Sequence, residues 1–365
     1  MNIALVSSDG NCGVYEASQI LRAGFEANNH RVRYVGVQRG NARDLREKLR
    51  QISADDEWVI FEYEPGIFRL EPLARAMLSL RLRGKRIILS IHELDVIKFS
   101  EYQQVMWRLN ETAWGNTLTA PFALLRGMGD MAYRYATLRI ALNMLGRLSQ
   151  RIMIHSPLSR KTVALINADP RKVRYAPLPV KPLPGDRAAM RRALGLPVDC
   201  FAFIAPGFLF RRKRITDIIA QLPAGTELWV VGKESVYERG YLEEIQAQVR
   251  QSGKHDQVRL IQEYDEERNI EPYIIAADAV VLYYRDVFQS AVACQAMGAG
   301  KPCIVSNLPG FGEYSAASIM VETPQELHQA MLDIQDAQRY NHLRDETAQI
   351  RAAHSPQQIA AQYLE

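Results

Sequence analysis

Four consecutive cations are the residues of this sequence best suited to chemistry on a charged ligand. Residues 211–214 read Arg-Arg-Lys-Arg and follow Gly207, just downstream of a short apolar run at 201–205. Guanidinium and ammonium groups form strong charge-assisted hydrogen bonds with phosphate oxygens. We therefore expect a diphosphate to bind here. A solvated charged surface is the alternative interpretation.

A second polar turn lies between an apolar run at 279–283 and a small-residue helix predicted at 291–297. The turn, residues 285–290, contains Asp286, Gln289 and Ser290. Ligands of open α/β sheets bind outside the carboxyl ends of the strands. The first N–H groups of a helix also favour phosphate. The pattern predicts an anion site here, and an ordinary scaffold turn fits it about as well.

Two further candidates lie in the first half of the chain. Residues 9–14, Asp-Gly-Asn-Cys-Gly-Val, separate a predicted strand at 2–7 from a predicted helix at 15–28. The full GxGxxG pattern is missing, which disfavours a classical NAD site. His92 follows the apolar run 86–91, where a neutral imidazole can contact a sugar hydroxyl. A plain turn glycine at Gly13 and a surface histidine are the alternatives.

Composition sets the limits of the molecule. The 365 residues are 47% hydrophobic, which suggests two domains of about 150 to 200 residues. The net charge of +4 gives no indication of nucleic acid, and the four scattered cysteines form no metal-binding pattern. The first residues predict a strand, so we expect no signal sequence, and the sequence contains no run of 18 apolar residues. We expect a cytoplasmic protein without metal or cofactor.

Alternating strands and helices run through both halves of the chain and predict an α/β fold. A stretch with four prolines in ten residues, 176–185, separates the halves. We expect two doubly wound Rossmann-like domains facing across a cleft, at 1–178 and 179–345. A C-terminal helix at 346–365 is expected to pack back toward the first domain. The further predicted strands are 32–37, 58–62, 151–155, 173–177, 227–231, 257–261, 303–306 and 320–321.

A helical insert at about 99–150 interrupts the first domain. Arg139, Arg147 and Arg151 recur at multiples of four and are expected on one helical face. A basic amphipathic helix can lie on an anionic membrane surface, which predicts peripheral contact with the inner membrane through residues 112–161. A solvated helix face that covers the domain core explains the pattern about equally well.

Five motifs occur in the order typical of one known family. They are Asn11-Cys-Gly-Val-Tyr-Glu, Glu62-Tyr-Glu-Pro-Gly-Ile-Phe, Leu89-Ser-Ile-His-Glu, the segment from Gly207 to Lys213, and the segment from Gln289 to Pro302. Together they resemble the two-domain GT-B glycosyltransferases, specifically the retaining family 4 type of bacterial polysaccharide synthesis. The resemblance covers essentially the whole chain.

This resemblance implies transfer of a sugar from a nucleotide sugar, either GDP-mannose or a UDP-sugar. The acceptor would be lipid-linked or a saccharide, in exopolysaccharide or lipopolysaccharide biosynthesis, and neither metal nor nucleic acid would take part. Lys213, helped by Arg212, would stabilise the leaving diphosphate, and His92 would contact the donor sugar. The remaining implied donor contacts are Gly13, Val14, Arg211, Gln289, Ser290, Ala291 and Gln295.

The sequence departs from the family pattern at its acidic pair. Gln295 stands at the second Glu, and Val287 stands at the first, with Asp286 one residue earlier as the candidate catalytic carboxylate. Gln295 can still bond ribose hydroxyls, without charge assistance. A non-catalytic GT-B subunit or scaffold of a synthesis complex is therefore the second hypothesis. A nucleotide-sugar 2-epimerase is a third, disfavoured by the transferase-type motif at 289–302.

Overall fold

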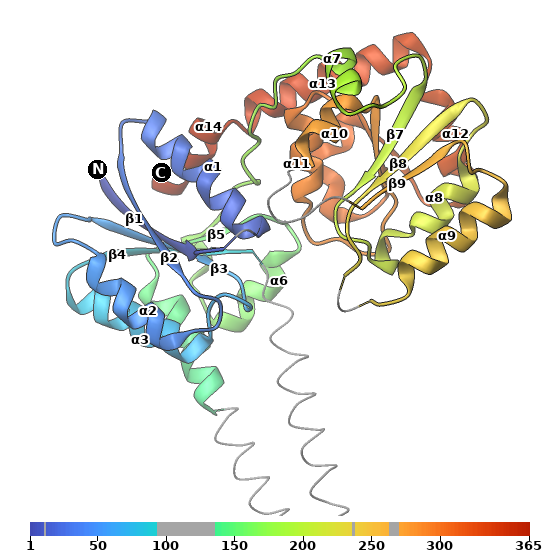
Figure 1. Cartoon of the computed structure of the whole chain (residues 1–365). Helices are drawn as coiled ribbons and strands as arrows, with labels where there is room; N and C mark the ends of the chain where they lie inside the picture. Colours follow the sequence, from blue (N-terminus) through green and yellow to red (C-terminus); the bar gives the residue numbers. More distant parts are fainter. Residues whose placement is uncertain (11, 93–135, 236–237, 263–269) are drawn as a thin grey trace, which may run out of the picture. The chain divides into compact units, whose positions relative to one another are not determined.

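The computed structural model describes residues 1–365 except 11, 93–135, 236–237 and 263–269 (Figure 1). The chain forms two compact units. Unit 1 contains Met1–Pro177 and Ile359–Glu365, and unit 2 contains Leu178–Gln358. The change of unit at Pro177 falls inside the proline-rich stretch. Each unit is a parallel sheet covered by helices on both faces, as the α/β prediction requires.

The sheet of unit 1 has six parallel strands in the order β2-β1-β3-β4-β5-β6. Their bounds are β1 (Asn2–Ser8), β2 (Arg31–Val37), β3 (Trp58–Tyr63), β4 (Arg86–Ile91), β5 (Arg151–Ile154) and β6 (Val173–Tyr175). The central strands read as nearly continuous apolar runs because both faces of the sheet are covered. The carboxyl ends of these parallel strands meet at one edge, which brings the polar residues that follow β3, β4 and β5 together.

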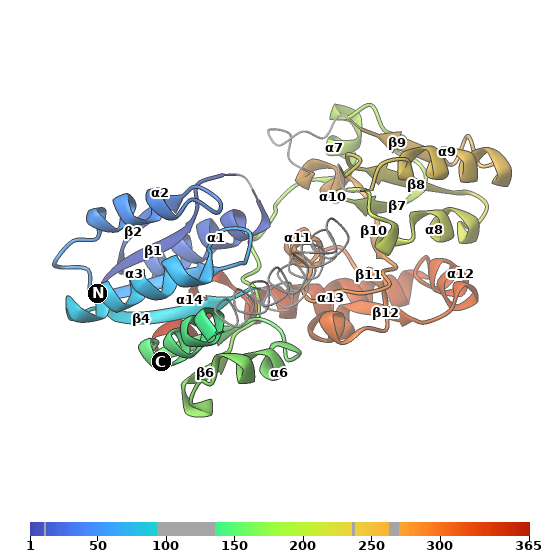
Figure 2. The ribbon, with the colours of Figure 1, turned by 90° about the horizontal axis from the view of Figure 1, so that it is seen from below.

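Helices of unit 1 cover opposite faces of its sheet (Figures 1 and 2). α1 (Gly13–Ala27) and α14 (Pro356–Leu364) pack on one face, and α2 (Ala42–Lys48) and α3 (Leu70–Leu82) pack on the other. Phe25 of α1 and Tyr363 of α14 meet edge to face, with ring centroids 5.9 Å apart. The last residues of the chain are therefore part of the core of unit 1. The shorter helices are η1 (Leu49–Gln51), α6 (Ser159–Val163), η2 (Ala164–Ile166) and η3 (Pro170–Lys172).

Most of the predicted insert at 99–150 lies outside the described residues. Residues 136–148 are helical, with Arg139 and Arg147 exposed while Leu145 is buried against the core. The expected alignment of Arg151 with these arginines is wrong, because the helix ends at 148 and Arg151 begins β5. Its guanidinium lies over the ring of Trp58, 5.1 Å from the ring centroid. Within the described ranges, no helix is both long and apolar enough to cross a membrane.

Unit 2 repeats the architecture with the strand order β12-β11-β10-β7-β8-β9, again all parallel. The strands are β7 (Phe201–Pro206), β8 (Thr226–Val231), β9 (Val258–Ile261), β10 (Ala279–Leu282), β11 (Cys303–Ser306) and β12 (Ser318–Val321). One face carries α8 (Ile215–Gln221), α9 (Tyr241–Ser252) and α12 (Pro324–Asp333). The other carries α7 (Arg187–Ala193), α10 (Glu271–Ala276), α11 (Ala291–Gly298), η5 (Pro309–Ala317) and α13 (Ala337–Ala353) (Figure 1).

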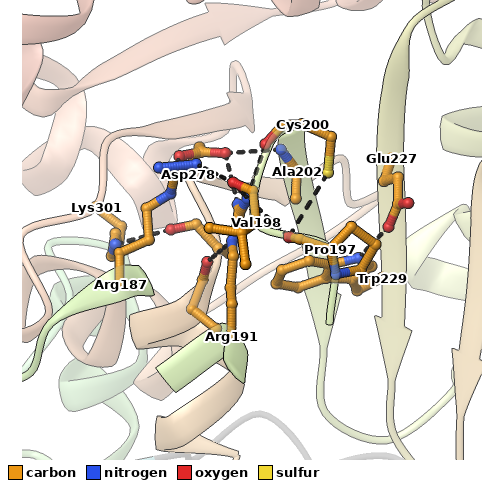
Figure 3. Close-up of polar contacts among 12 residues, drawn as sticks. Arg187, Arg191, Pro197, Val198, Cys200, Ala202, Glu227, Trp229, Asp278 and Lys301 are labelled. Atoms are coloured by element: carbon orange, nitrogen blue, oxygen red, sulfur yellow. Dashed lines mark hydrogen bonds and ion pairs between the residues drawn. The ribbon is translucent and has the colours of Figure 1, made fainter. Parts of the chain in front are cut away.

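A buried charge network holds the amino edge of the unit 2 sheet together (Figure 3). Arg191 is fully buried, and its Nη2 lies 2.7 Å from the carboxylate of Asp278, just before β10. The same carboxylate accepts a hydrogen bond from the amide of Ala202 in β7. Nearby, the ammonium of Lys301 donates to the carbonyl of Ala277 at 2.7 Å. Because the buried cations are paired or hydrogen-bonded, this edge is a structural anchor. The sequence pattern had indicated neither α7 nor this network.

Candidate functional site

Lys213 lies at the opposite, carboxyl edge of the unit 2 sheet, in the short helix η4 (Arg211–Lys213) after β7. Its side chain is 8% exposed, and its ammonium donates to the carbonyl of Pro206 at 2.9 Å. Gly207 has φ +88°, and a Cβ there would lie 2.9 Å from the Lys213 nitrogen. The glycine is thus what lets the backbone turn this tightly and lets the ammonium lie against it.

The charge on Lys213 is poorly compensated. Burial and, as the smaller cause, the neighbouring charge of Arg212 together lower the pKa of Lys213 to about 7. Among the described residues no carboxylate pairs with Lys213, and the other group that faces it is the ring of Tyr284 at 5.8 Å. A buried ammonium that lacks a counter-ion favours binding of an anion, because the anion supplies the missing charge.

The four predicted cations at 211–214 do not act as one cluster. Arg211 pairs with Glu244, with 2.5 Å between Nη2 and Oε1, and Arg214 pairs with Asp217 at 2.6 Å. Arg212 instead lies over the rings of Phe210 and Tyr284 and donates to the carbonyl of Asp286. Lys213 and Arg212 are therefore the two cations of the four without a carboxylate partner in the described part of the chain.

The turn after β10 lies beside η4. The amide of Arg285 donates to the carbonyl of Arg212 at 2.7 Å, so the two loops are hydrogen-bonded to each other. A Cβ on Gly207 would also be 3.8 Å from Val292 in the first turn of α11. Three predicted parts of the unit 2 site therefore lie together. They are the two cations without a carboxylate partner among the described residues, Arg212 and Lys213, the turn at 285–290, and the start of α11.

Ser290 caps α11, with its hydroxyl accepting from the amide of Ala293 at 3.2 Å. Ala291 is exposed at the first helical position, and its amide is one of the helix's unpaired N–H groups. Gln289 precedes the cap, and its buried Nε2 has no hydrogen-bond partner in the described residues. Gln295 lies one helical turn after Ala291 and is half-buried. This edge therefore offers several unused donors in one place.

The two candidates for the first acidic position differ in environment. Val287 is 9% exposed and packs in the core of unit 2. Asp286 is exposed, and within the described ranges its carboxylate forms neither a hydrogen bond nor an ion pair. Only Asp286 therefore presents an acid to solvent at this turn.

Glu313 is a candidate that the sequence analysis missed. It lies in η5, and burial raises its pKa to about 7. One of its carboxylate oxygens is buried and has no partner among the described residues. Gly310 of the same helix packs on the turn, since a Cβ there would lie 2.4 Å from the carbonyl of Val287. In the sequence, the only indication of this residue is an acid at the end of the turn-like segment Pro309-Gly-Phe-Gly-Glu.

The carboxyl edge of unit 1 contains a buried polar cluster, in which His92 follows β4. The Nε2 atom of His92 lies 2.5 Å from the carboxylate of Glu62, at the end of β3. The hydroxyl of Ser90 lies 2.9 Å from the same carboxylate, 2.8 Å from Nε2 of His155 and 3.0 Å from the hydroxyl of Tyr363. We call these five residues the His92 cluster.

The pKa values within the His92 cluster are shifted by burial and by the hydrogen bonds of the cluster. Burial alone would raise the pKa of Glu62, but hydrogen bonds from His92 and Ser90 bring it below its usual range. Burial lowers the pKa of His155 to about 4, so this ring is neutral near pH 7. Burial and the charge of Glu62 raise the pKa of Tyr363 well above 10, so its hydroxyl keeps its proton.

Glu62, His92 and His155 also form the one set of potential metal ligands found in the described part of the chain, with ligand atoms within 4.8 Å of one another. Ligands of one tetrahedral ion, at bond lengths of about 2.1 Å, lie more than about 3 Å apart. The 2.5 Å between Glu62 and His92 is a hydrogen-bond distance. The geometry thus fits a hydrogen-bonded network better than a metal site.

Gly13 and Val14 form the first turn of α1, after Cys12, whose sulfur accepts from the amide of Tyr15. Their amides are not used by the helix. A Cβ on Gly13 would meet no atom of the described residues within 4 Å, so none of them requires a glycine there. The open space leaves room for a ligand to approach the backbone.

Comparisons with known proteins agree with this geometry. Residues 207–336 match the family model for glycosyl transferases group 1. Anabaena HepE, solved with UDP-glucose, superposes with a TM-score of 0.70 at 15% identity, covering 100% of this chain and 98% of that one. Sucrose-phosphate synthase from Thermosynechococcus elongatus gives 0.68 at 17% identity, covering 99% and 97%. No match was found among curated proteins by sequence.

WaaG, a glycosyltransferase of lipopolysaccharide biosynthesis, has the same fold, with a TM-score of 0.55 at 15% identity, covering 99% of this chain and 97% of that one. The fold confirms the predicted pair of Rossmann-like domains of GT-B type. The match at 207–336 lies inside unit 2 and covers the loops that carry Lys213, Asp286 and Ser290. The chain therefore has the two-domain GT-B fold, and a segment of its unit 2 is similar to the group 1 glycosyl transferases.

Proposed function

We propose that the protein transfers a sugar, with retention, from a nucleoside-diphosphate sugar to a lipid-linked or saccharide acceptor. One observation carries the proposal: a buried ammonium without a counter-ion, Lys213, lies against Gly207 at the carboxyl edge of a group 1 glycosyl transferase domain. A diphosphate fits this position by charge, and binding it would raise the pKa of Lys213 and keep the ammonium protonated.

In the proposed reaction the bond between the sugar's anomeric carbon and the diphosphate oxygen breaks. A bond to the acceptor oxygen forms on the same face, and the acceptor's proton passes to the diphosphate. Lys213 and Arg212 stabilise the charge that develops on the leaving group. The amides of Ser290 and Ala291 contact the phosphates at the start of α11. These groups act by electrostatics and position, so the step needs no covalent intermediate.

The other proposed contacts complete the donor site. Gln289 and Gln295 bind donor hydroxyls, and Asp286 contacts the donor near the reacting centre. The amides of Gly13 and Val14 cradle the phosphates from unit 1, while His92 contacts the donor sugar. Arg211 was predicted as a donor contact, and its pairing with Glu244 leaves it a supporting role beside η4.

UDP-sugars are the first donors to test, because the HepE structures hold UDP and UDP-glucose, and GDP-mannose is the second. The role of WaaG supports an acceptor from bacterial surface polysaccharide. We further propose a cytoplasmic protein that contacts the inner membrane through residues 112–161, supported by the exposed Arg139 and Arg147.

The test is release of nucleoside diphosphate from each donor by purified protein with membrane extract as acceptor. The proposal expects release from one donor class, dependent on the extract and lost in Lys213→Met. Intact nucleotide binding without release from any donor would contradict a catalytic role.

A non-catalytic GT-B subunit is the second candidate function, favoured by the burial of Val287 where the family places an acid. Under that reading, Lys213→Met and His92→Gln leave cellular polysaccharide unchanged. The same variants in the producing cell therefore separate the two candidates.

A further inference from the structure

The hydrogen bond between His92 and Glu62 determines which nitrogen of the His92 ring carries a proton. The pKa of Glu62 is lowered, so this group is a carboxylate and can only accept. Its partner at 2.5 Å, the Nε2 atom of His92, must therefore be the donor. In the neutral ring the other nitrogen, Nδ1, then keeps a free lone pair and is the atom that can accept a hydrogen bond.

The rest of the His92 cluster fixes the carboxylate in place. The Nδ1 atom of His155 lies 2.8 Å from the carbonyl of Ala176, and a carbonyl only accepts, so Nδ1 is protonated and Nε2 is an acceptor. The hydroxyl of Ser90 donates to Glu62. The hydroxyl of Tyr363 supplies the proton for Nε2 of His155, at 3.3 Å, or for the oxygen of Ser90. The carboxylate of Glu62 thus accepts hydrogen bonds from both Ser90 and His92, while the hydroxyl proton of Tyr363 has two possible acceptors.

We propose that Glu62 is a positioning residue that holds His92 with Nε2 protonated and Nδ1 free to accept a hydrogen bond from a donor-sugar hydroxyl. Tyr363, from α14, completes the network, so the last helix of the chain contributes to the orientation of His92. The catalytic part of this inference rests on the proposed glycosyl transfer, whereas the proton assignment does not depend on it.

A purely structural role for Glu62 is the rival explanation. Glu62 is 1% exposed, and loss of a buried carboxylate partner lowers stability whatever the function of its neighbours. The two explanations differ in coupling. A positioning residue acts through His92, so its loss has no further effect once His92 is gone.

The first experiment is proton NMR of the full chain. A short N–H to carboxylate bond shields the imidazole proton from exchange and shifts it strongly downfield. We expect one such signal in the wild type, absent in His92→Gln and lost or moved upfield in Glu62→Gln. Glu227→Gln is the matched control, because Glu227 is a half-buried carboxylate of unit 2 that accepts from Trp229. Absence of the signal in the wild type, or its persistence in Glu62→Gln, overturns the proton assignment.

The second experiment is a double-mutant cycle on the transfer rate. Glu62→Gln is expected to lower kcat roughly 10- to 100-fold, the scale of a misplaced catalytic group, with the donor KM within about twofold. The variant with both Glu62→Gln and His92→Gln should be no slower than His92→Gln alone. Losses that multiply instead overturn the positioning role, as does an unchanged kcat in Glu62→Gln.

The conservative change Tyr363→Phe tests the same network in case the Glu62→Gln variant does not fold. It removes one hydroxyl but keeps the ring that packs on Phe25. In Tyr363→Phe we expect the downfield signal of the His92 imidazole proton to remain visible at a changed chemical shift, and kcat to fall a few-fold. Tyr340→Phe, which removes a hydroxyl bonded to the carbonyl of Asp278 in unit 2, should change neither. If the wild type transfers no sugar, the proposed function fails while the NMR result still decides the proton assignment.

Discussion

Both units have a six-stranded parallel sheet, but the carboxyl edges of the two sheets differ in how their buried charges are satisfied. In unit 1 the buried carboxylate of Glu62 accepts hydrogen bonds from His92 and Ser90. In unit 2 the buried ammonium of Lys213 has a carbonyl and an aromatic ring as its neighbours, without a carboxylate in the described ranges. The buried charge of unit 1 therefore has hydrogen-bond donors within its own unit, whereas the buried charge of unit 2 lacks, among the described residues, a counter-ion that an anion could supply.

This difference suggests different roles for the carboxyl edges of the two sheets. A preorganised, hydrogen-bonded cluster suits a group that must hold one geometry near the reacting atoms. An under-compensated cation suits a group that binds a highly charged ligand and is stabilised by it. The amino edge of unit 2 shows that burial of cations alone is not the signal, because Arg191 is more deeply buried than Lys213 and is fully paired with Asp278.

The largest expected effect comes from removing the unbalanced cation. Lys213→Met should lower the transfer rate roughly 10²- to 10³-fold, because a preorganised charge at the leaving group is lost. Lys301→Met is the matched control, since Lys301 is equally buried and donates to a carbonyl, but at the amino edge. It should change the melting temperature and leave transfer within about twofold. If Lys213→Met and Lys301→Met lowered the transfer rate equally, the claim that only the carboxyl edge of unit 2 binds the diphosphate would be wrong.

The second prediction is a pH dependence of nucleotide affinity set by Lys213. Because burial lowers the pKa of the free protein's Lys213 to about 7, binding of a diphosphate above that pH requires uptake of a proton. The affinity should fall as pH rises from 7 to 9, by up to about tenfold per pH unit. Calorimetric titration in buffers of different ionisation enthalpy measures both the affinity and the proton uptake. A flat affinity with no proton uptake contradicts the assignment.

The third prediction concerns acid stability and unit 1. The pKa of His155 is lowered from 6.5 to about 4 in the fold, so between these values the unfolded chain binds a proton that the folded chain does not. The contribution to stability is full above about pH 6.5 and is lost as the pH falls toward 4. His155→Gln should flatten this part of the stability profile, measured by urea unfolding at several pH values. An unchanged slope would show that the ring titrates normally in the fold.

The smallest expected effects are at the positions where the family motif is altered. Gln295→Ala should weaken nucleotide binding by about 1 kcal/mol, roughly fivefold, the value of one neutral hydrogen bond. Asp286→Asn should change nucleotide binding less than that, because its exposed carboxylate has no partner among the described residues. Gln349→Ala, on an exposed part of α13, is the control for both. A loss of 100-fold at Gln295 would mean that it replaces the family's Glu in full.

Much of the fold follows from local patterns. Buried strands such as β4 and β10 are short apolar runs next to turn residues, and their ends were predicted within one or two residues. The loops after these strands could be identified as well, because the carboxyl edge follows from parallel topology alone. His92, Lys213 and Ser290 therefore fall where the sequence indicated.

Long-range pairing could not be predicted. Two of the four cations at 211–214 are paired, with Glu244 and Asp217, and two have no carboxylate partner in the described ranges. A run of like charges in the sequence does not show which of its members have partners. Tyr363 joins Ser90 across 273 residues of sequence, a contact that no local pattern indicates. The raised pKa of Glu313 likewise depends on burial by residues distant in the sequence, which no local pattern shows.

The most direct test of the contrast between the two edges is isothermal titration of the wild type and Lys213→Met with UDP, GDP, ADP and TDP. The account predicts that the wild type binds one of these nucleotides and that Lys213→Met weakens this binding at least about tenfold, as expected for a hydrogen bond to a charged group. Lys301→Met should bind as the wild type does. Absence of binding to all four, or equal binding by Lys213→Met, would contradict the claim that the carboxyl edge of unit 2 is a diphosphate site.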